Sequence, residues 1–205
     1  MPLLQSWSPH ANAQAAIWRI EEPEVFFAAR TGLNPSIRHG QKRLEHLAGR
    51  FLVQHLWPEI EFGEIVIGPN GKPHAPDLSG RAFSISHSFP YVAAIVTHEI
   101  PCGIDIQVPK ANIAEISPKF LSERENALFR TNDDNLLWIW SAKEAVYKWA
   151  NTAGLQLLRD IELKYLYPGG EQREATFLIE HPDLKAIIDV KGLLTPEFAL
   201  AVALQ

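Results

Sequence analysis

The 205-residue chain has a single cysteine and no apolar run long enough to span a membrane. Cys102 can form no intrachain disulfide, and one thiol cannot build a thiolate metal cluster, so we expect a protein of a reducing, cytoplasmic compartment. The longest apolar runs, 91–96 and 198–204, are far shorter than the roughly 20 residues of a membrane-spanning helix. The first residues carry no basic stretch before a long apolar segment, which argues against a signal peptide.

The chain also lacks the Gly-x-Ser-x-Gly and His-Glu-x-x-His patterns, so neither a serine hydrolase of that type nor a zinc protease is indicated. A formal net charge of −5 argues against nonspecific binding of nucleic acid. Positive charge nevertheless gathers in one segment, at Arg38, Lys42, Arg43 and Arg50. A phosphate-rich small ligand would explain this cluster, and so would a basic surface helix with no ligand.

Composition and patterning predict an α+β protein with one large domain or two small ones. Hydrophobic residues make up 46% and charged residues 21%, which is typical of a soluble globular chain. Apolar strands over 91–96 and 198–204 each follow a proline and come some tens of residues after an amphipathic helix. Two similar α/β halves, 1–102 and 103–205, would account for this repetition, and so would chance likeness of two buried strands.

Hydrophobic periodicity predicts helices over 41–55, 117–129 and 135–150. The strands that we predict are 63–67, 82–86, 91–96, 104–107, 160–165, 174–179, 186–190 and 198–204. Turns are indicated at 69–71 and 168–170.

Asp105 lies near the end of an apolar strand, ahead of Val108-Pro109, where the chain must leave the sheet. A carboxylate in this position can point out of the core and bind Mg²⁺, which usually takes one or two protein carboxylates together with waters and substrate phosphates. An aspartate at a strand end can equally serve a turn or a cap, so Asp105 alone does not decide between these roles.

Glu144 and Lys148 have the i, i+4 spacing of a helix ion pair, with the acid first. Taken alone they would be a solvated pair worth about 0.3–0.5 kcal/mol. The preceding Trp140-Ser141 changes this interpretation, because a surface helix seldom places a tryptophan beside its polar face without packing it against something. We expect the buried face to carry Ala142, Ala145, Val146 and Trp149, and the other face Trp140, Lys143, Glu144, Tyr147 and Lys148.

Two further segments could hold phosphate. His87 follows a strand within Ser84-Ile85-Ser86-His87-Ser88, and such a turn offers hydroxyls and backbone donors to a phosphate oxygen, although a lone histidine is more often structural. Lys72 projects from the constrained turn Gly71-Lys72-Pro73, which lacks the pattern of a phosphate-binding P-loop.

In chain order the segments are Asn70-Gly71-Lys72-Pro73, Phe83-Ser84-Ile85-Ser86-His87-Ser88, Gly103-Ile104-Asp105-Ile106 and Trp140-Ser141-x-Lys143-Glu144-x-x-x-Lys148. Their order and spacing resemble the phosphopantetheinyl transferases of the larger, Sfp-type branch, over about positions 36 to 165. The resemblance implies two similar α/β halves related by a pseudo-twofold axis, with the active site between them. Coenzyme A would contact the half 1–102, and the metal-binding and catalytic motifs would lie in the half 103–205.

The implied reaction moves 4′-phosphopantetheine from coenzyme A to a serine of an apo acyl carrier protein or peptidyl carrier domain, as a holo-acyl-carrier-protein synthase does. It releases adenosine 3′,5′-bisphosphate, depends on Mg²⁺ (or Mn²⁺), and serves lipid or secondary-metabolite biosynthesis. The resemblance makes Glu144, Lys148 and Asp105 catalytic and Asp105, Gln107 and Glu144 metal-binding. The residues implied to contact coenzyme A are Arg43, Arg50, Lys72, Ser86, His87, Lys143 and Lys148.

Gln107 departs from the pattern, since many family members carry an acid at this position. The amide oxygen can bind Mg²⁺ directly or hold a water that does, but it brings no negative charge. Two alternatives therefore stay open: a degenerate relative that binds coenzyme A or a carrier protein without turnover, and a Mg²⁺-dependent hydrolase of phosphoanhydrides. We expect a monomer with no nucleic-acid or membrane partner, and a docking surface for an acidic carrier protein at Lys119, Arg124 and Arg130 with Phe120 as an apolar contact.

Overall fold

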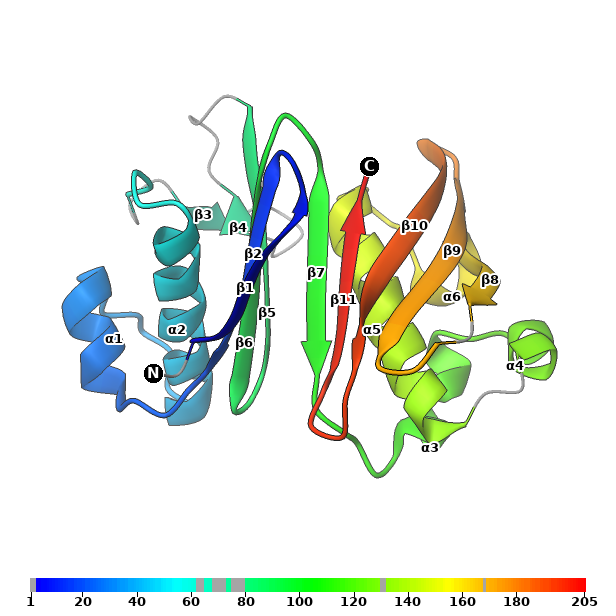
Figure 1. Ribbon diagram of the computed structural model, residues 1–205, viewed down its shortest axis with the longest axis horizontal. Helices are drawn as coiled ribbons and strands as arrows, with labels where there is room; N and C mark the ends of the chain where they lie inside the picture. The colour runs from blue at the N-terminus through cyan, green and yellow to red at the C-terminus, as the bar shows by residue number, and fades with distance from the viewer. Residues whose placement is uncertain (1–2, 62–64, 68–72, 75–79, 130–131, 168) are drawn as a thin grey trace. The chain divides into compact units, whose positions relative to one another are not determined.

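The computed structural model describes residues 3–61, 65–67, 73–74, 80–129, 132–167 and 169–205. The chain divides into two compact units, Met1–Ile100 and Pro101–Gln205. Each unit has its own antiparallel sheet and helices, as Figure 1 shows. Each also has its own hydrophobic core. The predicted α+β class is thereby confirmed.

The first unit is built on a four-stranded antiparallel sheet in the order β1-β2-β6-β5. Its strands are β1 (Leu3–His10), β2 (Ala13–Arg19), β5 (Arg81–Ser88) and β6 (Tyr91–His98). Its helices are α1 (Glu24–Thr31) and α2 (Gly40–Leu56), and a separate pair is formed by β3 (Val66–Ile67) and β4 (Pro73–His74). The predicted turn at 69–71 lies outside the described residues.

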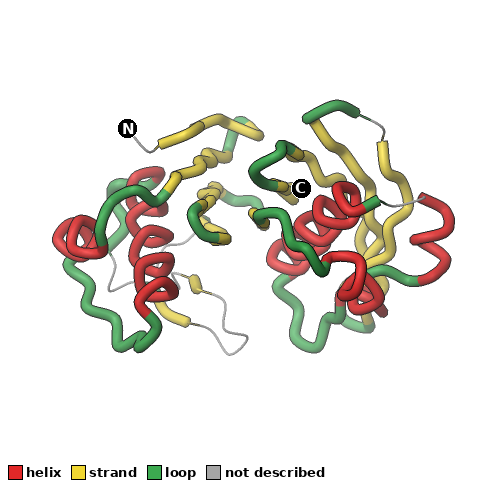
Figure 2. Tube along the Cα trace, turned by 90° about the horizontal axis from the view of Figure 1, so that it is seen from below, coloured by secondary structure: helices red, strands yellow, loops and turns green. Residues whose placement is uncertain are grey.

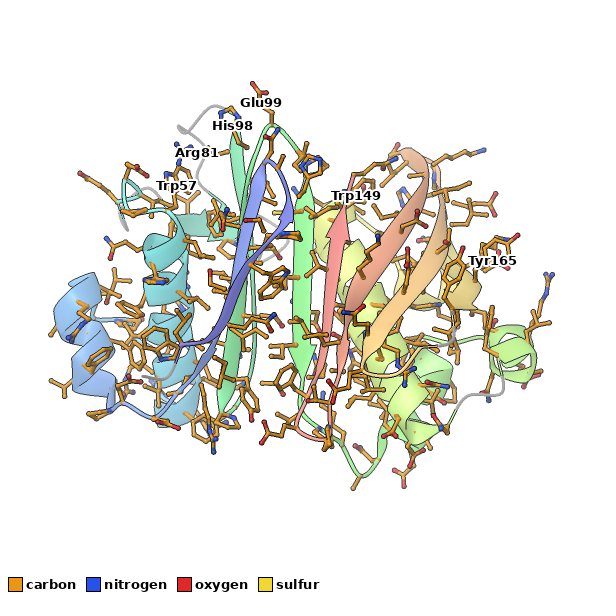
Figure 3. All side chains as sticks on the ribbon, viewed as in Figure 1. Trp57, Arg81, His98, Glu99, Trp149 and Tyr165 are labelled. Atoms are coloured by element: carbon orange, nitrogen blue, oxygen red, sulfur yellow. The ribbon has the colours of Figure 1, made fainter. Side chains whose placement is uncertain are left out.

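Helix α2 packs on the sheet because its apolar stripe is continuous, and Figure 2 shows this helix and the strands as separate layers. Leu47, Leu52 and Val53 are fully buried in the core of the unit. Trp57 ends the helix, and the guanidinium of Arg81, at the start of β5, lies 4.8 Å from the centre of its ring (Figure 3). This contact joins the end of α2 to the sheet.

The second unit has a five-stranded antiparallel sheet in the order β7-β11-β10-β9-β8. Its strands are β7 (Cys102–Gln107), β8 (Ile161–Tyr167), β9 (Gln172–His181), β10 (Leu184–Leu194) and β11 (Ala199–Leu204). Its helices are α3 (Ile113–Ile116), the short 3₁₀ helix η2 (Ser117–Lys119), α4 (Glu123–Phe129), α5 (Asp133–Ala150) and α6 (Leu157–Asp160).

One helix prediction is wrong: the segment 117–129 is not continuous but consists of η2 and then α4. The break falls at Ser122, where a capping box starts a new helix. The Oγ of Ser122 accepts a hydrogen bond from the backbone N–H of Glu125 (3.2 Å), and Oε2 of Glu125 accepts one from the backbone N–H of Ser122 (2.8 Å).

The two units share a strand–helix–hairpin topology. In the first, β2 precedes α2, and the hairpin β5–β6 follows with β6 paired antiparallel to β2. In the second, β7 precedes α5, and the final hairpin β10–β11 has β11 paired antiparallel to β7. The two strands predicted from the apolar repeat are β6 and β11, which take the same place in their sheets.

In the described part of the chain, no helix is both long and apolar enough to cross a bilayer.

Gly103 sets the distance between β7 and α5. A Cβ atom added there would overlap the backbone oxygen of Ala145 and lie 2.7 Å from the backbone nitrogen of Trp149, which is labelled in Figure 3. Both obstacles are helix backbone, so neither can move without displacing α5. The helix can approach β7 this closely only because the strand carries glycine at this position.

We therefore expect Gly103→Ala to destabilise the protein by about 1–3 kcal/mol or more, the usual cost of overpacking. Urea unfolding followed by circular dichroism measures this loss. Gly170→Ala is the matched control, because no atom lies within 4 Å of a Cβ there. Equal stability of the two variants would contradict the proposed role of the glycine.

Candidate active site

Asp105 lies on β7 with only 2% of its surface exposed. Both its backbone oxygen and its carboxylate accept hydrogen bonds. Its backbone oxygen accepts a hydrogen bond from Oγ of the buried Ser141 on α5 (2.9 Å). Its carboxylate accepts one from the ammonium group of Lys148 (2.7 Å) and one from the amide nitrogen of Gln107 (2.9 Å). The residue is therefore a fixed carboxylate rather than a turn or capping residue.

Lys148 comes from the last turns of α5 and reaches back to β7. Besides Asp105, its ammonium group donates to the backbone oxygen of Ile104 (3.0 Å). Its side chain is 21% exposed, so the ammonium group is bound by protein oxygens and is still partly accessible to solvent. Lys148 thus forms an ion pair with Asp105 on β7, and its charge also acts on Glu144.

Glu144 lies half-buried on α5, where the negative charge of Asp105 makes its ionisation less favourable. Burial and the negative charge of Asp105 raise the pKa of Glu144 above its usual value. The charges of Lys148 and Lys110 and a hydrogen bond from the Trp140 indole act in the opposite direction without cancelling the rise. A carboxylate with a raised pKa beside a second carboxylate is suited to accept a proton or to bind a cation.

Trp140 packs against other side chains, as we predicted from its place on the helix. Its ring lies 5.2 Å from that of Phe120, centre to centre, and the Lys110 ammonium lies 4.4 Å above it. Sequence reasoning missed Lys110, which lies just after Val108-Pro109 and adds positive charge near Glu144. Phe120 is only 2% exposed, so its predicted use as an apolar contact for a carrier protein is wrong.

The other residues of that predicted docking surface have different positions. Lys119 and Arg124 are exposed, whereas Arg130 lies outside the described residues.

The chemistry of this group fits a divalent cation of the Mg²⁺ type. Among the described residues, no three His, Cys, Asp or Glu side chains come together as a metal site, so the candidate set is two carboxylates, Asp105 and Glu144, and the amide of Gln107. Mg²⁺ commonly uses only one or two protein carboxylates. Gln107 now points its nitrogen at Asp105, and a rotation of the amide would present its oxygen instead.

Lys143 corrects another expectation, that it lies on the polar face of α5. Its side chain is fully buried, and its three ammonium hydrogens meet three acceptors: Oε1 of Glu125 (2.9 Å) and the backbone oxygens of Leu157 (3.4 Å) and Ile161 (2.6 Å). No hydrogen of this group is left for a phosphate. The physical reason is helix geometry, since five residues turn Lys143 about 140° away from Lys148.

Glu125 is the second residue that sequence reasoning missed. Oε1 binds Lys143 and the backbone N–H of Leu163 (2.8 Å), and Oε2 accepts from Ser122. Burial alone would raise the pKa of Glu125, but the charge of Lys143 and these hydrogen bonds lower it. The pattern Ser122-x-x-Glu125 is the signal that could have located this residue, because it is the sequence signature of a capping box.

The predicted coenzyme A contacts of the first unit lie on α2 and β5. Arg43 is engaged by Oε1 of Glu24 (2.7 Å) and by the backbone oxygen of Ile37 (2.7 Å). Arg50 and Ser86 are buried, with 9% and 5% exposed, and His87 is exposed. Lys72 lies outside the described residues.

Comparison with known proteins identifies the family of the chain. The family model of the 4′-phosphopantetheinyl transferase superfamily matches residues 101–203, which include Asp105, Glu144 and Lys148. The 4′-phosphopantetheinyl transferase AcpT of Escherichia coli K12 is 33% identical over 135 residues, covering 62% of this chain and 68% of AcpT. AcpT of Escherichia coli O157:H7 is 31% identical over 134 residues with the same coverage, and AcpT of Salmonella typhi 29% over 126 residues, covering 58% and 65%.

The chain therefore belongs to the 4′-phosphopantetheinyl transferase superfamily, and the protein is a transferase.

The buried pair Lys143–Glu125 generates a stability prediction. Lys143→Met leaves a carboxylate buried without its counter-charge, and such a loss costs about 3–5 kcal/mol. The double variant Lys143→Met, Glu125→Gln should be less destabilised than the single variant, because no charge is then stranded. Urea unfolding at neutral pH measures both, and a single-variant loss below about 1 kcal/mol, the range of a surface ion pair, would contradict the structural role.

Proposed function

We propose that this protein transfers 4′-phosphopantetheine from coenzyme A to a serine of an apo acyl carrier protein or peptidyl carrier domain. The observation that carries this proposal is the group formed by Asp105, Glu144 and Lys148 on β7 and α5, inside the segment that matches the superfamily. Two units of like topology in one chain favour the larger, Sfp-type branch and a monomer. We place the protein in the cytoplasm.

The chain's own residues supply the proton transfers and much of the electrostatics. Glu144 takes the proton of the carrier serine, whose oxygen then attacks the β-phosphorus of coenzyme A. The bond from that phosphorus to the bridging oxygen breaks, and adenosine 3′,5′-bisphosphate leaves with the electron pair. Lys148, held beside Asp105, stabilises the charge on the leaving oxygen and can protonate it.

Asp105 and Glu144 are the residues that would hold Mg²⁺ (or Mn²⁺), with Gln107 or a water beside them. A bound ion would supply positive charge to the pyrophosphate of coenzyme A. The raised pKa of Glu144 supports this assignment, because a cation between the two carboxylates would offset the repulsion between their negative charges. Since Gln107 adds no charge, we expect the ion to be bound more weakly than by three acids.

Intact-mass spectrometry of an apo carrier protein tests the reaction directly. After incubation with this protein, coenzyme A and Mg²⁺, the carrier should gain one phosphopantetheine, and the sample without metal should gain none. Apo carriers of fatty-acid, polyketide and nonribosomal-peptide type should be included. Binding of coenzyme A without any gain would favour a binding-only relative, and release of phosphopantetheine without a carrier would favour a hydrolase.

Glu144→Gln should reduce transfer to background while the protein remains folded. The pKa of Glu144 is raised in the folded state, so the ionised carboxylate disfavours folding at any pH above its unfolded value. Removing that charge should leave the metal-free protein at least as stable as the parent at neutral pH. The mass assay and thermal unfolding measure the two effects, and full activity of the variant would rule out Glu144 as the base.

A further inference from the structure

We propose that Glu45, a buried acid on α2, is a positioning residue that holds His87 for binding a phosphate group of coenzyme A. This inference rests on the proposed function only for the identity of the ligand. The contacts that carry it all lie within the first unit, on α2 and on β5.

Close packing of α2 on β5 brings the two residues together. A Cβ added at Gly49 would lie 2.9 Å from Cγ2 of Ile85, so the helix touches the strand at this point. Glu45 is one turn earlier on the helix, about 6 Å along its axis, and His87 is two residues further on the strand, about 6.6 Å along it. The matching displacements place Glu45 opposite His87.

Glu45 is 6% exposed and uses both carboxylate oxygens. Oε2 lies 3.1 Å from Nδ1 of His87, and Oε1 accepts a hydrogen bond from the side-chain amide of Gln41 (3.2 Å). A buried carboxylate at this distance fixes the orientation of the imidazole ring. The His87 side chain is itself 44% exposed, so a ligand can reach the imidazole that Glu45 orients.

Arg50, also on α2, adds positive charge that acts on His46. Arg50 is 9% exposed, and among the described residues no carboxylate or other acceptor pairs with its guanidinium. Burial alone lowers the pKa of Arg50. His46, between Glu45 and Arg50 on α2, has its pKa lowered to about 4 by burial and by the positive charges of Arg50 and His87, so it is neutral at physiological pH.

The charges of this group favour an anion. Glu45 is a counter-charge for the imidazole of His87, whereas no described residue pairs with the buried guanidinium of Arg50. A phosphate group carries negative charge and accepts hydrogen bonds from an imidazole N–H. Coenzyme A has two kinds of phosphate, the 3′-phosphate and the pyrophosphate, and either could be the one bound here.

Isothermal titration of the full chain with coenzyme A tests the role of Glu45 independently of transfer. Glu45→Gln keeps the size of the side chain and removes its charge, and we expect the affinity to fall about tenfold, the effect of weakening one charge-assisted hydrogen bond. In a His87→Ala background the same substitution should change the affinity less than about twofold, because its effect passes through His87.

Glu99→Gln is the matched control. Glu99 lies 3.8 Å from Nδ1 of His98, but both side chains are largely exposed, as Figure 3 shows at the end of β6. This variant should bind coenzyme A like the parent. Dephospho-coenzyme A distinguishes the phosphates: a loss with coenzyme A alone points to the 3′-phosphate, and a loss with both ligands points to the pyrophosphate. Either pattern supports the proposal.

Unchanged affinity of Glu45→Gln would overturn the proposal, and so would an equal loss in the presence and absence of His87. A parent protein that binds coenzyme A but transfers nothing would overturn the proposed function and leave the role of Glu45 standing. A parent protein that does not bind coenzyme A would overturn both. Thermal unfolding of each variant excludes loss of the fold as the cause of weaker binding.

Discussion

The close approach of α5 to β7 at Gly103 is the contact on which the second unit depends. It lets Ser141 and Lys148 reach the backbone and side chain of Asp105 from two places on one helix. Any side chain at this glycine would lift the helix from the strand and lengthen these hydrogen bonds together. The geometry of the candidate site and the packing of the unit are therefore not separate properties, because the same backbone contact determines both.

Helix α5 contributes a lysine to each of two networks of charged residues. Lys143 and Glu125 form a fully buried pair, with every donor of the lysine and both oxygens of the acid satisfied, and it connects α4, α5 and β8. Lys148 and Asp105 form a pair at the edge of the core, where Glu144 adds a second negative charge that is only partly compensated. A satisfied network stabilises one structure, whereas an incompletely balanced one is the kind of arrangement that suits cation binding or proton transfer.

Sequence reasoning located the long periodic elements well. In α2, α5, β6 and β11 the spacing of the apolar residues matches the residues that are buried. It missed β1, most of which is exposed, and also β2 and α1. It joined η2 to α4 because propensity gives no sign of the break unless the capping box is noticed. The motif residues Asp105 and Lys148 do meet. The environment of Lys143 could not be read from spacing, since its partner Glu125 is brought to it only by the tertiary fold.

The same physical device occurs in both units, although the residues differ. In each, a glycine at a helix–strand contact removes the one side chain that would separate the two elements, at Gly49 on α2 and at Gly103 on β7. In each, an acid and a base from the two elements then pair one turn or less from the contact, as Glu45 with His87 and Lys148 with Asp105. In the first unit the helix supplies the acid and the strand the base, and in the second these roles are exchanged. The two pairs do not lie at equivalent places in the shared topology, because β7 corresponds to β2 and not to β5. Each pair therefore follows from its own close helix–strand contact, which places an imidazole beside a carboxylate in the first unit and an ammonium group beside a carboxylate in the second.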